Sequence, residues 1–226
     1  MNMKTLLLLI LVGPLISCAP DSHVVEIMAF SSLGSPCVAK SDFQIIQAAG
    51  TLDISAGQSP NLPAFYVQIN FETYVATPPV QVAGRIIAEE NRDRVVIDGY
   101  HLTYTIQKGR GVVKTLSAVD DVPLLAVYTG SAKGFGGLNL IGPKGGAALF
   151  NEVPVAVNGT PTADDVAQLK VGVRLDGYMS GQGNRVSSGT VWFPIRVVQS
   201  NNCANGYLPP NQCPFPGQDG YAVCAP

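Results

Sequence analysis

Short stretches in which hydrophobic and polar residues alternate recur along this chain and set its fold class. In residues 65–72 the odd positions are hydrophobic and the even positions are mostly polar, and residues 171–176 and 191–198 repeat the pattern. Successive side chains of a strand point to opposite faces of a sheet, so this pattern predicts strands with one buried face. Further strands are expected at residues 43–47, 52–55, 80–87, 112–116, 122–128 and 147–157.

The number and spacing of these strands predict an all-β protein. About nine strands without alternating long helices favour an antiparallel β-sandwich of the immunoglobulin or fibronectin-like kind, or an open barrel. Residues 97–104 resemble the central strand of fibronectin-type and immunoglobulin-like modules. The one helix expected is short, with Thr162 as N-cap, Asp165 three residues later and an end near Gln168.

Two strands carry irregularities. In residues 94–106 the hydrophobic positions change parity at Asp98-Gly99, which predicts a β-bulge there, although a two-residue hairpin would also satisfy the pattern. In residues 191–198, Pro194 lacks a backbone donor, which predicts an edge strand or a bulge. Within the glycine-rich residues 134–144, residues 137–144 look briefly like a phosphate loop. Pro143 and Gly145 break that motif, so a flexible glycine loop is expected instead.

The first 17 residues have the order of a signal peptide. Lys4 precedes a hydrophobic run over residues 6–16 that is too short to span a bilayer. Residues 15–18, Leu-Ile-Ser-Cys, resemble the lipobox of bacterial lipoproteins. The resemblance implies cleavage before Cys18, acylation of Cys18 and a lipid bilayer as partner. Ala19 in place of Asp favours the outer membrane, and an ordinary secreted protein is the alternative.

After a signal peptide at 1–17, the domain prediction gives a lipidated tether at 18–36, a β-sandwich at 37–200 and an irregular Cys-rich tail at 201–226. Residues 24–30 are a possible short strand inside the tether. Four cysteines remain once Cys18 is lipidated, which in an exported chain predicts two disulfides of open connectivity: Cys37, Cys203, Cys213 and Cys224. Their spacing does not match zinc sites. We expect the tail to form a structural cap on the sheet, with a presented binding loop as the alternative.

Composition excludes some functions, and no motif supplies a reaction. Only 13% of residues are charged and the net charge is −2, which argues against a nucleic-acid partner. We expect no cofactor, no metal and no catalytic residue. His101 is predicted to be a lone, solvated surface residue. The adjacent acids at 120–121 point to opposite sides of a strand, so they form no proton-sharing dyad.

Three aromatic residues on the polar faces of strands form the candidate ligand platform: Tyr66, Tyr178 and Trp192. If they lie together they suit a sugar or a peptide; otherwise another element covers them. The sequence therefore predicts a membrane-anchored envelope lipoprotein without enzymatic activity, with a structural or recognition role and a possible envelope protein or glycan as ligand. The alternatives are a carbohydrate- or protein-binding adhesion module and a hydrolase centred on His101.

Overall fold

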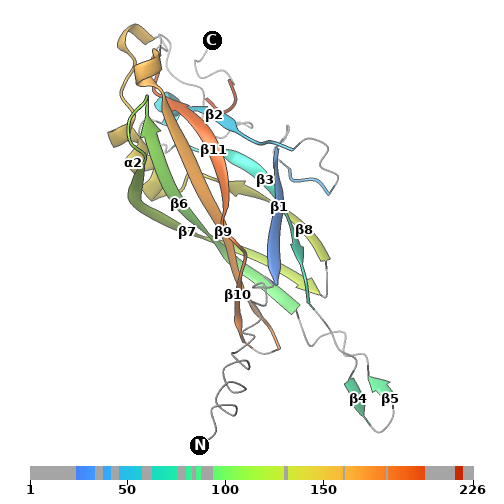
Figure 1. The fold of residues 1–226 in the computed structure, drawn as a ribbon. Helices are drawn as coiled ribbons and strands as arrows, with labels where there is room; N and C mark the ends of the chain where they lie inside the picture. The colour runs from blue at the N-terminus through green and yellow to red at the C-terminus, as the bar shows by residue number, and fades with distance from the viewer. Residues whose placement is uncertain are drawn as a thin grey trace, which may run out of the picture.

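The fold of the chain is known from a computed structural model. It describes residues 24–33, 38–41, 46–57, 63–75, 80–82, 85–87, 94–129, 132–159, 161–181, 183–201 and 217–220. These residues form mostly β-structure, which confirms the all-β class (Figure 1). Among them, no helix combines the length and hydropathy that a membrane span requires.

The strands lie in two main sheets and one small hairpin (Figure 1). The three-stranded sheet has the order β1 (Val25–Ser32), β3 (Tyr66–Thr73) and β8 (Ala132–Asn139). The six-stranded sheet has the order β2 (Gly50–Asp53), β11 (Val191–Val198), β9 (Ala167–Met179), β6 (Arg94–Lys108) and β7 (Lys114–Thr129), and β10 (Arg185–Ser187) pairs with β9. Strands β4 (Val80–Val82) and β5 (Arg85–Ile87) form the hairpin.

Both sheets contribute to one hydrophobic core. The buried hydrophobic side chains of β9 occupy alternate positions, which confirms the pattern predicted for residues 171–176 and extends it to the start of the strand: Ala167, Leu169, Val171, Val173 and Leu175. Phe193 of β11 packs against Phe30 of β1 and against Phe65, with ring centroids 5.3 and 5.7 Å away. These aromatic contacts bury large apolar areas and tie the two sheets together.

One pair of strands corrects the all-antiparallel prediction. Strand β2 pairs with β11 in parallel, whereas the other pairs of the two sheets are antiparallel. Pairing with β2 begins opposite Ile195, so Pro194 has a partner strand on the β9 side alone. The edge position predicted for Pro194 is therefore confirmed for the first half of β11.

The bulge predicted at Asp98-Gly99 is confirmed. Strand β6 runs without a break, and its register with both β7 and β9 shifts between Ile97 and Gly99. The two segments predicted at 112–116 and 122–128 belong to one long strand, β7. The short helix predicted at Thr162 is a 3-10 turn, η3 (Ala163–Asp165), which ends because β9 begins at Ala167. Asp165 accepts the Thr162 backbone N–H, and that bond lowers the pKa of its carboxyl.

The prediction for residues 134–157 is wrong. The strand expected at 147–157 is replaced by helix α2 (Pro143–Glu152), and much of the expected glycine loop is strand β8. The carboxylate of Asp120, on β7, accepts the backbone N–H of Lys144 at 3.0 Å and of Gly145 at 2.8 Å. Tyr104 donates to the same carboxylate at 2.9 Å. A buried acid from another strand thus caps the helix, which local sequence could not show.

Glycines allow the Asp120 carboxylate and the Tyr104 ring to come close to helix α2, and the Phe71 ring to come close to strand β8. A Cβ on Gly145 would lie 2.4 Å from the Tyr104 ring, and one on Gly142 would lie 2.3 Å from the Asp120 carboxyl carbon. In β8, a Cβ on Gly134 would lie 2.4 Å from the Phe71 ring. The glycines therefore make room for a carboxylate and two aromatic rings, where the sequence had suggested flexibility.

Strand β1 lies within the segment predicted to be the tether. It pairs with β3 along its whole length, and its Val25, Ile27 and Phe30 side chains are buried in the core. The possible strand at 24–30 is therefore confirmed, and a fragment that began at residue 37 would lose it. Of the tail, residues 217–220 pack against β2: Asp53 donates its backbone N–H to Gly217 and Asp219 donates to Thr51. This covers a sheet edge and favours the cap interpretation for that part.

Replacing Gly145 with Ala should destabilise the protein by about 1–3 kcal/mol, because the added methyl group collides with the buried Tyr104 ring. Urea unfolding followed by circular dichroism measures the change. Gly136→Ala is the matched control, since nothing lies within 4 Å of its added Cβ. If Gly145→Ala were as stable as this control, the proposed close contact at α2 would be wrong.

Candidate functional site

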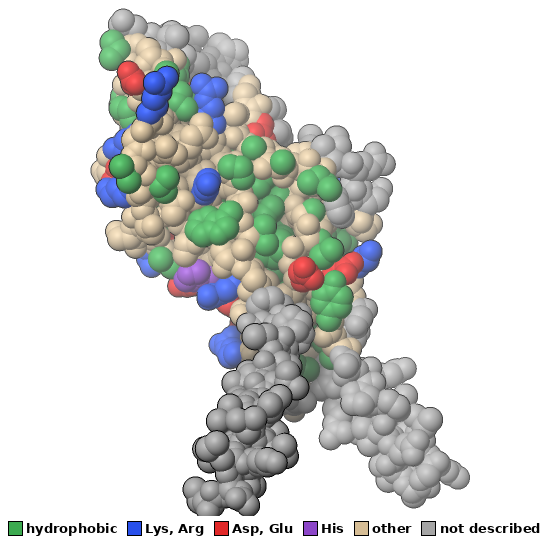
Figure 2. Space-filling model, viewed as in Figure 1, with side chains coloured by type: hydrophobic (Ala, Val, Ile, Leu, Met, Phe, Trp, Pro, Cys, Tyr) green, Lys and Arg blue, Asp and Glu red, His purple; other side chains and the backbone are tan. Residues whose placement is uncertain are grey.

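The outward face of the six-stranded sheet carries the polar and aromatic side chains that are free to meet a ligand. It comprises the residues of β6, β9 and β11 that alternate with the core positions, and we call it the outer face: His101, Thr103, Thr105, Gln168, Lys170, Gly172, Arg174, Asp176, Trp192, Pro194 and Arg196. Charged and hydrophobic side chains are mixed over the visible surface of the molecule (Figure 2).

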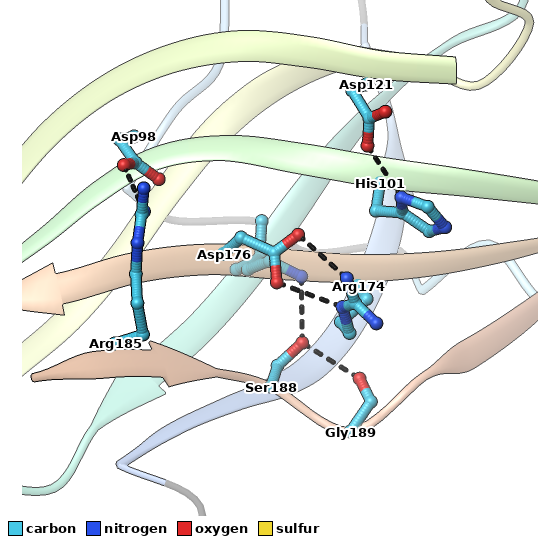
Figure 3. Close-up of polar contacts among 9 residues, drawn as sticks. Asp98, His101, Asp121, Arg174, Asp176, Arg185, Ser188 and Gly189 are labelled. Atoms are coloured by element: carbon cyan, nitrogen blue, oxygen red, sulfur yellow. Dashed lines mark hydrogen bonds and ion pairs between the residues drawn. The ribbon is translucent and has the colours of Figure 1, made fainter. Parts of the chain in front are cut away.

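A charged hollow of about 710 Å³ lies at one end of this face, next to the bulge in β6. Arg174 binds Asp176 through two bonds, Nε to Oδ1 at 2.9 Å and Nη2 to Oδ2 at 3.1 Å. Arg185, on β10, reaches the bulged Asp98 at 2.5 Å (Figure 3). The bulge turns Asp98 toward this partner. Two of the three acids that line the hollow, Asp98 and Asp176, are thus paired with its two arginines.

His101 lies beside this hollow and has a partner, which corrects the prediction of a lone, solvated histidine. Its Nδ1 lies 2.6 Å from Oδ1 of Asp121, which stands opposite it on β7. The histidine side chain is 24% exposed and the aspartate 75%. Asp120 points inward to α2 while Asp121 points outward, so the prediction that the two form no dyad is confirmed.

The hydroxyl of Ser188, which Figure 3 shows below Asp176 and Arg174, is engaged by the backbone. It accepts the backbone N–H of Leu175 at 2.9 Å and donates to the carbonyl of Gly189 at 2.8 Å. Within the part of the chain that the structure describes, Asp121 is the hydrogen-bond partner of the His101 ring. The site has a base and a carboxylate, but among the described residues no hydroxyl or thiol is hydrogen-bonded to them.

Trp192 lines a second hollow, of about 400 Å³, on the same face. Thr105, Lys170, Trp192 and Pro194 line it. The indole is 48% exposed, so the alternative in which another element covers it is wrong. One edge of the ring lies over Gly172, where an added Cβ would be 3.1 Å from the indole Cη2. The missing side chain of Gly172 thus leaves room for the ring.

The three aromatic residues of the predicted platform do not come together. Tyr66 belongs to the three-stranded sheet, where Gln218 of the tail binds its backbone N–H and carbonyl. Trp192 stands opposite Gly172 of β9, and Tyr178 lies six residues further along that strand, roughly 20 Å away at about 3.3 Å per residue. Local alternation gave the correct face for Trp192 but could not show which sheet each strand joins.

Two cations near Trp192 were missed by the sequence reading. Lys170 lies directly opposite Pro194, and Arg196 follows Pro194 by two residues on the same face of β11. Both side chains are exposed, and neither makes an ion pair with a residue that the structure describes. The place of Lys170 near Trp192 depends on the β9–β11 register, which joins segments distant in sequence, whereas Arg196 lies on the same strand as Trp192.

The remaining predicted site residues cannot be placed. The lipidation site Cys18 and the disulfide candidates Cys37, Cys203, Cys213 and Cys224 lie outside the described residues. No group of three or more His, Cys, Asp or Glu side chains arranged to hold a metal occurs within the described ranges.

Comparison with known proteins gives no family for the chain. No protein-family model matches it, and a search of the curated proteins finds no match. The case for a function therefore depends on the geometry of the outer face and on the sequence signals.

The two cations should give the surroundings of Trp192 a positive potential, which a fluorescence experiment can measure. Trp192 is the only tryptophan of the chain. At matched ionic strength, iodide should quench its emission at least about twofold more efficiently than caesium, because positive charge concentrates anions. The joint substitution Lys170→Met and Arg196→Met should remove this difference. The control Lys133→Met, on the other sheet, should keep it. Equal quenching of the unmodified protein by both ions would contradict the prediction.

Proposed function

We propose that this protein is an exported bacterial lipoprotein, anchored to a membrane through acylated Cys18, that binds a component of the cell envelope with its outer face. The signal peptide order of residues 1–17 and the lipobox resemblance at 15–18 support the anchor. Several acyl chains together hold a protein on a bilayer almost irreversibly. Ala19 supports the outer membrane as the destination.

The position of β1 shortens the tether that the sequence predicted. Because β1 begins at Val25, residues 18–24 are all that separates the anchor from the sheet. Even fully extended, these residues reach at most about 25 Å, at roughly 3.5 Å per residue. In this proposal the β-domain stays close to the bilayer, and its ligand belongs to the membrane-proximal envelope.

The half-exposed Trp192 beside its hollow is the observation that carries the binding role. A large aromatic side chain fixed on a sheet contributes contact area at small entropic cost. A binding role without catalysis is supported by the His101–Asp121 pair, which has no described nucleophile in contact with it. The proposal therefore favours recognition over hydrolysis.

The proposal also includes the type of β-sandwich and the disulfide bonds. The two sheets share one core, and we take them as the layers of a β-sandwich of the immunoglobulin-like kind in which β2 joins by parallel pairing. The four cysteines other than Cys18 form two disulfides in the oxidising compartment to which export delivers the chain.

Replacing Cys18 with Ser should move the protein from the membrane fraction to the soluble envelope fraction, because the variant cannot be acylated. Fractionation of cells after a high-salt wash, followed by immunoblotting, measures the distribution. Ser17→Ala is the control, because it keeps a small residue before the cysteine and should leave the protein on the membrane. A Cys18→Ser variant that still sediments with washed membranes would refute the lipid anchor.

The soluble Cys18→Ser chain should capture an envelope component when it is immobilised and exposed to an envelope extract. Adding Trp192→Ala should reduce this capture at least about tenfold, since truncating a central aromatic anchor commonly costs more than about 1–2 kcal/mol. Phe135→Ala is the matched control, because Phe135 is also half-exposed but lies on the three-stranded sheet. Capture that is equal for Trp192→Ala and the unmodified surface would show that the outer face is not the binding face.

A further inference from the structure

The side chains that surround Trp192 define the chemical class of a ligand. We call Trp192, Pro194 and Arg196 of β11, together with Lys170 of β9, the Trp192 strip. We propose that the Trp192 strip binds a linear polysaccharide that carries carboxylate groups. This inference rests on the proposed function, because it assumes that the outer face is the binding face, and it names the ligand.

The aromatic part of the strip suits the ring of a sugar. One face of a pyranose presents mainly C–H groups, which pack well on an indole. Trp192 is 48% exposed, and one edge of its ring lies over Gly172, which restricts the ring on that side before any ligand arrives. A restricted ring loses little conformational freedom on binding, so its contact area contributes to affinity.

Two polar side chains along the strip suit sugar hydroxyl groups. Thr105 lines the hollow, and Gln168 stands opposite Arg196. Neither side chain makes a hydrogen bond with any residue that the structure describes. A hydroxyl and an amide can each donate and accept, which matches the two-way hydrogen bonding of sugar hydroxyls.

The charges of the strip favour an acidic polysaccharide over a neutral one. Lys170 and Arg196 are exposed, and the acids of the outer face are held elsewhere: Asp176 by Arg174 and Asp121 by His101. Arg196 lies four residues from Trp192 along β11, roughly 13 Å at about 3.3 Å per residue. A chain that stacks one ring on Trp192 and extends along β11 would place one carboxylate at Lys170 and the next at Arg196. The guanidinium fork of Arg196 also matches the geometry of a carboxylate.

The inference is tested with the full chain carrying Cys18→Ser and with oligogalacturonate as the carboxylated probe. Its methyl ester is the neutral probe, because esterification removes the charge and keeps the sugar backbone. Calorimetric titration should show binding of the acid form that is at least about tenfold tighter than binding of the ester, and the difference should shrink as salt is raised.

Variants locate the binding on the strip. Trp192→Ala should weaken binding of oligogalacturonate at least about tenfold, whereas Trp192→Phe, which keeps a ring, should retain part of the affinity. Lys170→Met and Arg196→Met should each weaken it several-fold and reduce its dependence on salt. Phe135→Ala and Lys133→Met remove an exposed aromatic residue and an exposed cation from the other sheet, and both should bind as the parent does.

The results separate this inference from the proposed function. Absence of oligogalacturonate binding, equal binding of the ester, or unchanged affinity in Trp192→Ala would overturn the inference. If Trp192-dependent capture from the envelope extract persists in that case, the outer face still binds a ligand, and the ligand is a protein or a neutral glycan. If Trp192-dependent capture is lost as well, the proposed function fails together with the inference. Circular dichroism of each variant confirms that the fold is kept.

Discussion

The buried carboxylate of Asp120 is the contact on which the arrangement of this domain depends. A charged group excluded from water is tolerated only when donors surround it, and Asp120 receives three: the Tyr104 hydroxyl and the backbone N–H groups of Lys144 and Gly145. Burial raises the pKa of Tyr104, so that its hydroxyl keeps its proton and remains a donor. The contact joins β6, β7 and α2, and it fixes which side of β7 faces the core. Because Asp120 points inward, its neighbour Asp121 points outward and meets His101.

The sequence predicted those parts of the fold that depend on local alternation. The strands at 65–72, 171–176 and 191–198, the bulge at Asp98 and the edge position of Pro194 all follow from side-chain parity or from a missing donor. Helix α2 and strand β8 were missed because tertiary contacts decide them. Glycine residues there suggested a loop, yet they make room for Asp120, Tyr104 and Phe71. The one local signal for α2 was Pro143 at its first turn, a position that proline favours.

The candidate site shows the same division between local and long-range information. Parity alone placed Trp192 on an outer face and predicted that Asp120 and Asp121 point apart. The grouping of Trp192 with Tyr66 and Tyr178 failed because membership of a sheet and position along a strand are set by pairing between distant segments. The same pairing brings Lys170 next to Pro194, so the place of Lys170 in the Trp192 strip could not be read from either segment by itself, whereas Arg196 shares the parity of Trp192 on β11.

The two hollows of the outer face differ in what an anionic ligand would have to displace. In the larger one, each guanidinium already holds a carboxylate of the same chain, Arg174 that of Asp176 and Arg185 that of Asp98. A ligand there must compete with partners that are tethered beside the cation and therefore always present at high effective concentration. Lys170 and Arg196 make no ion pair with any described residue, and Trp192 adds contact area at one end of the strip. The ion pairs of the larger hollow therefore favour a rigid surface at that end of the outer face. Lys170 and Arg196, which have no ion-pair partner among the described residues, favour binding of an anionic ligand at the Trp192 strip.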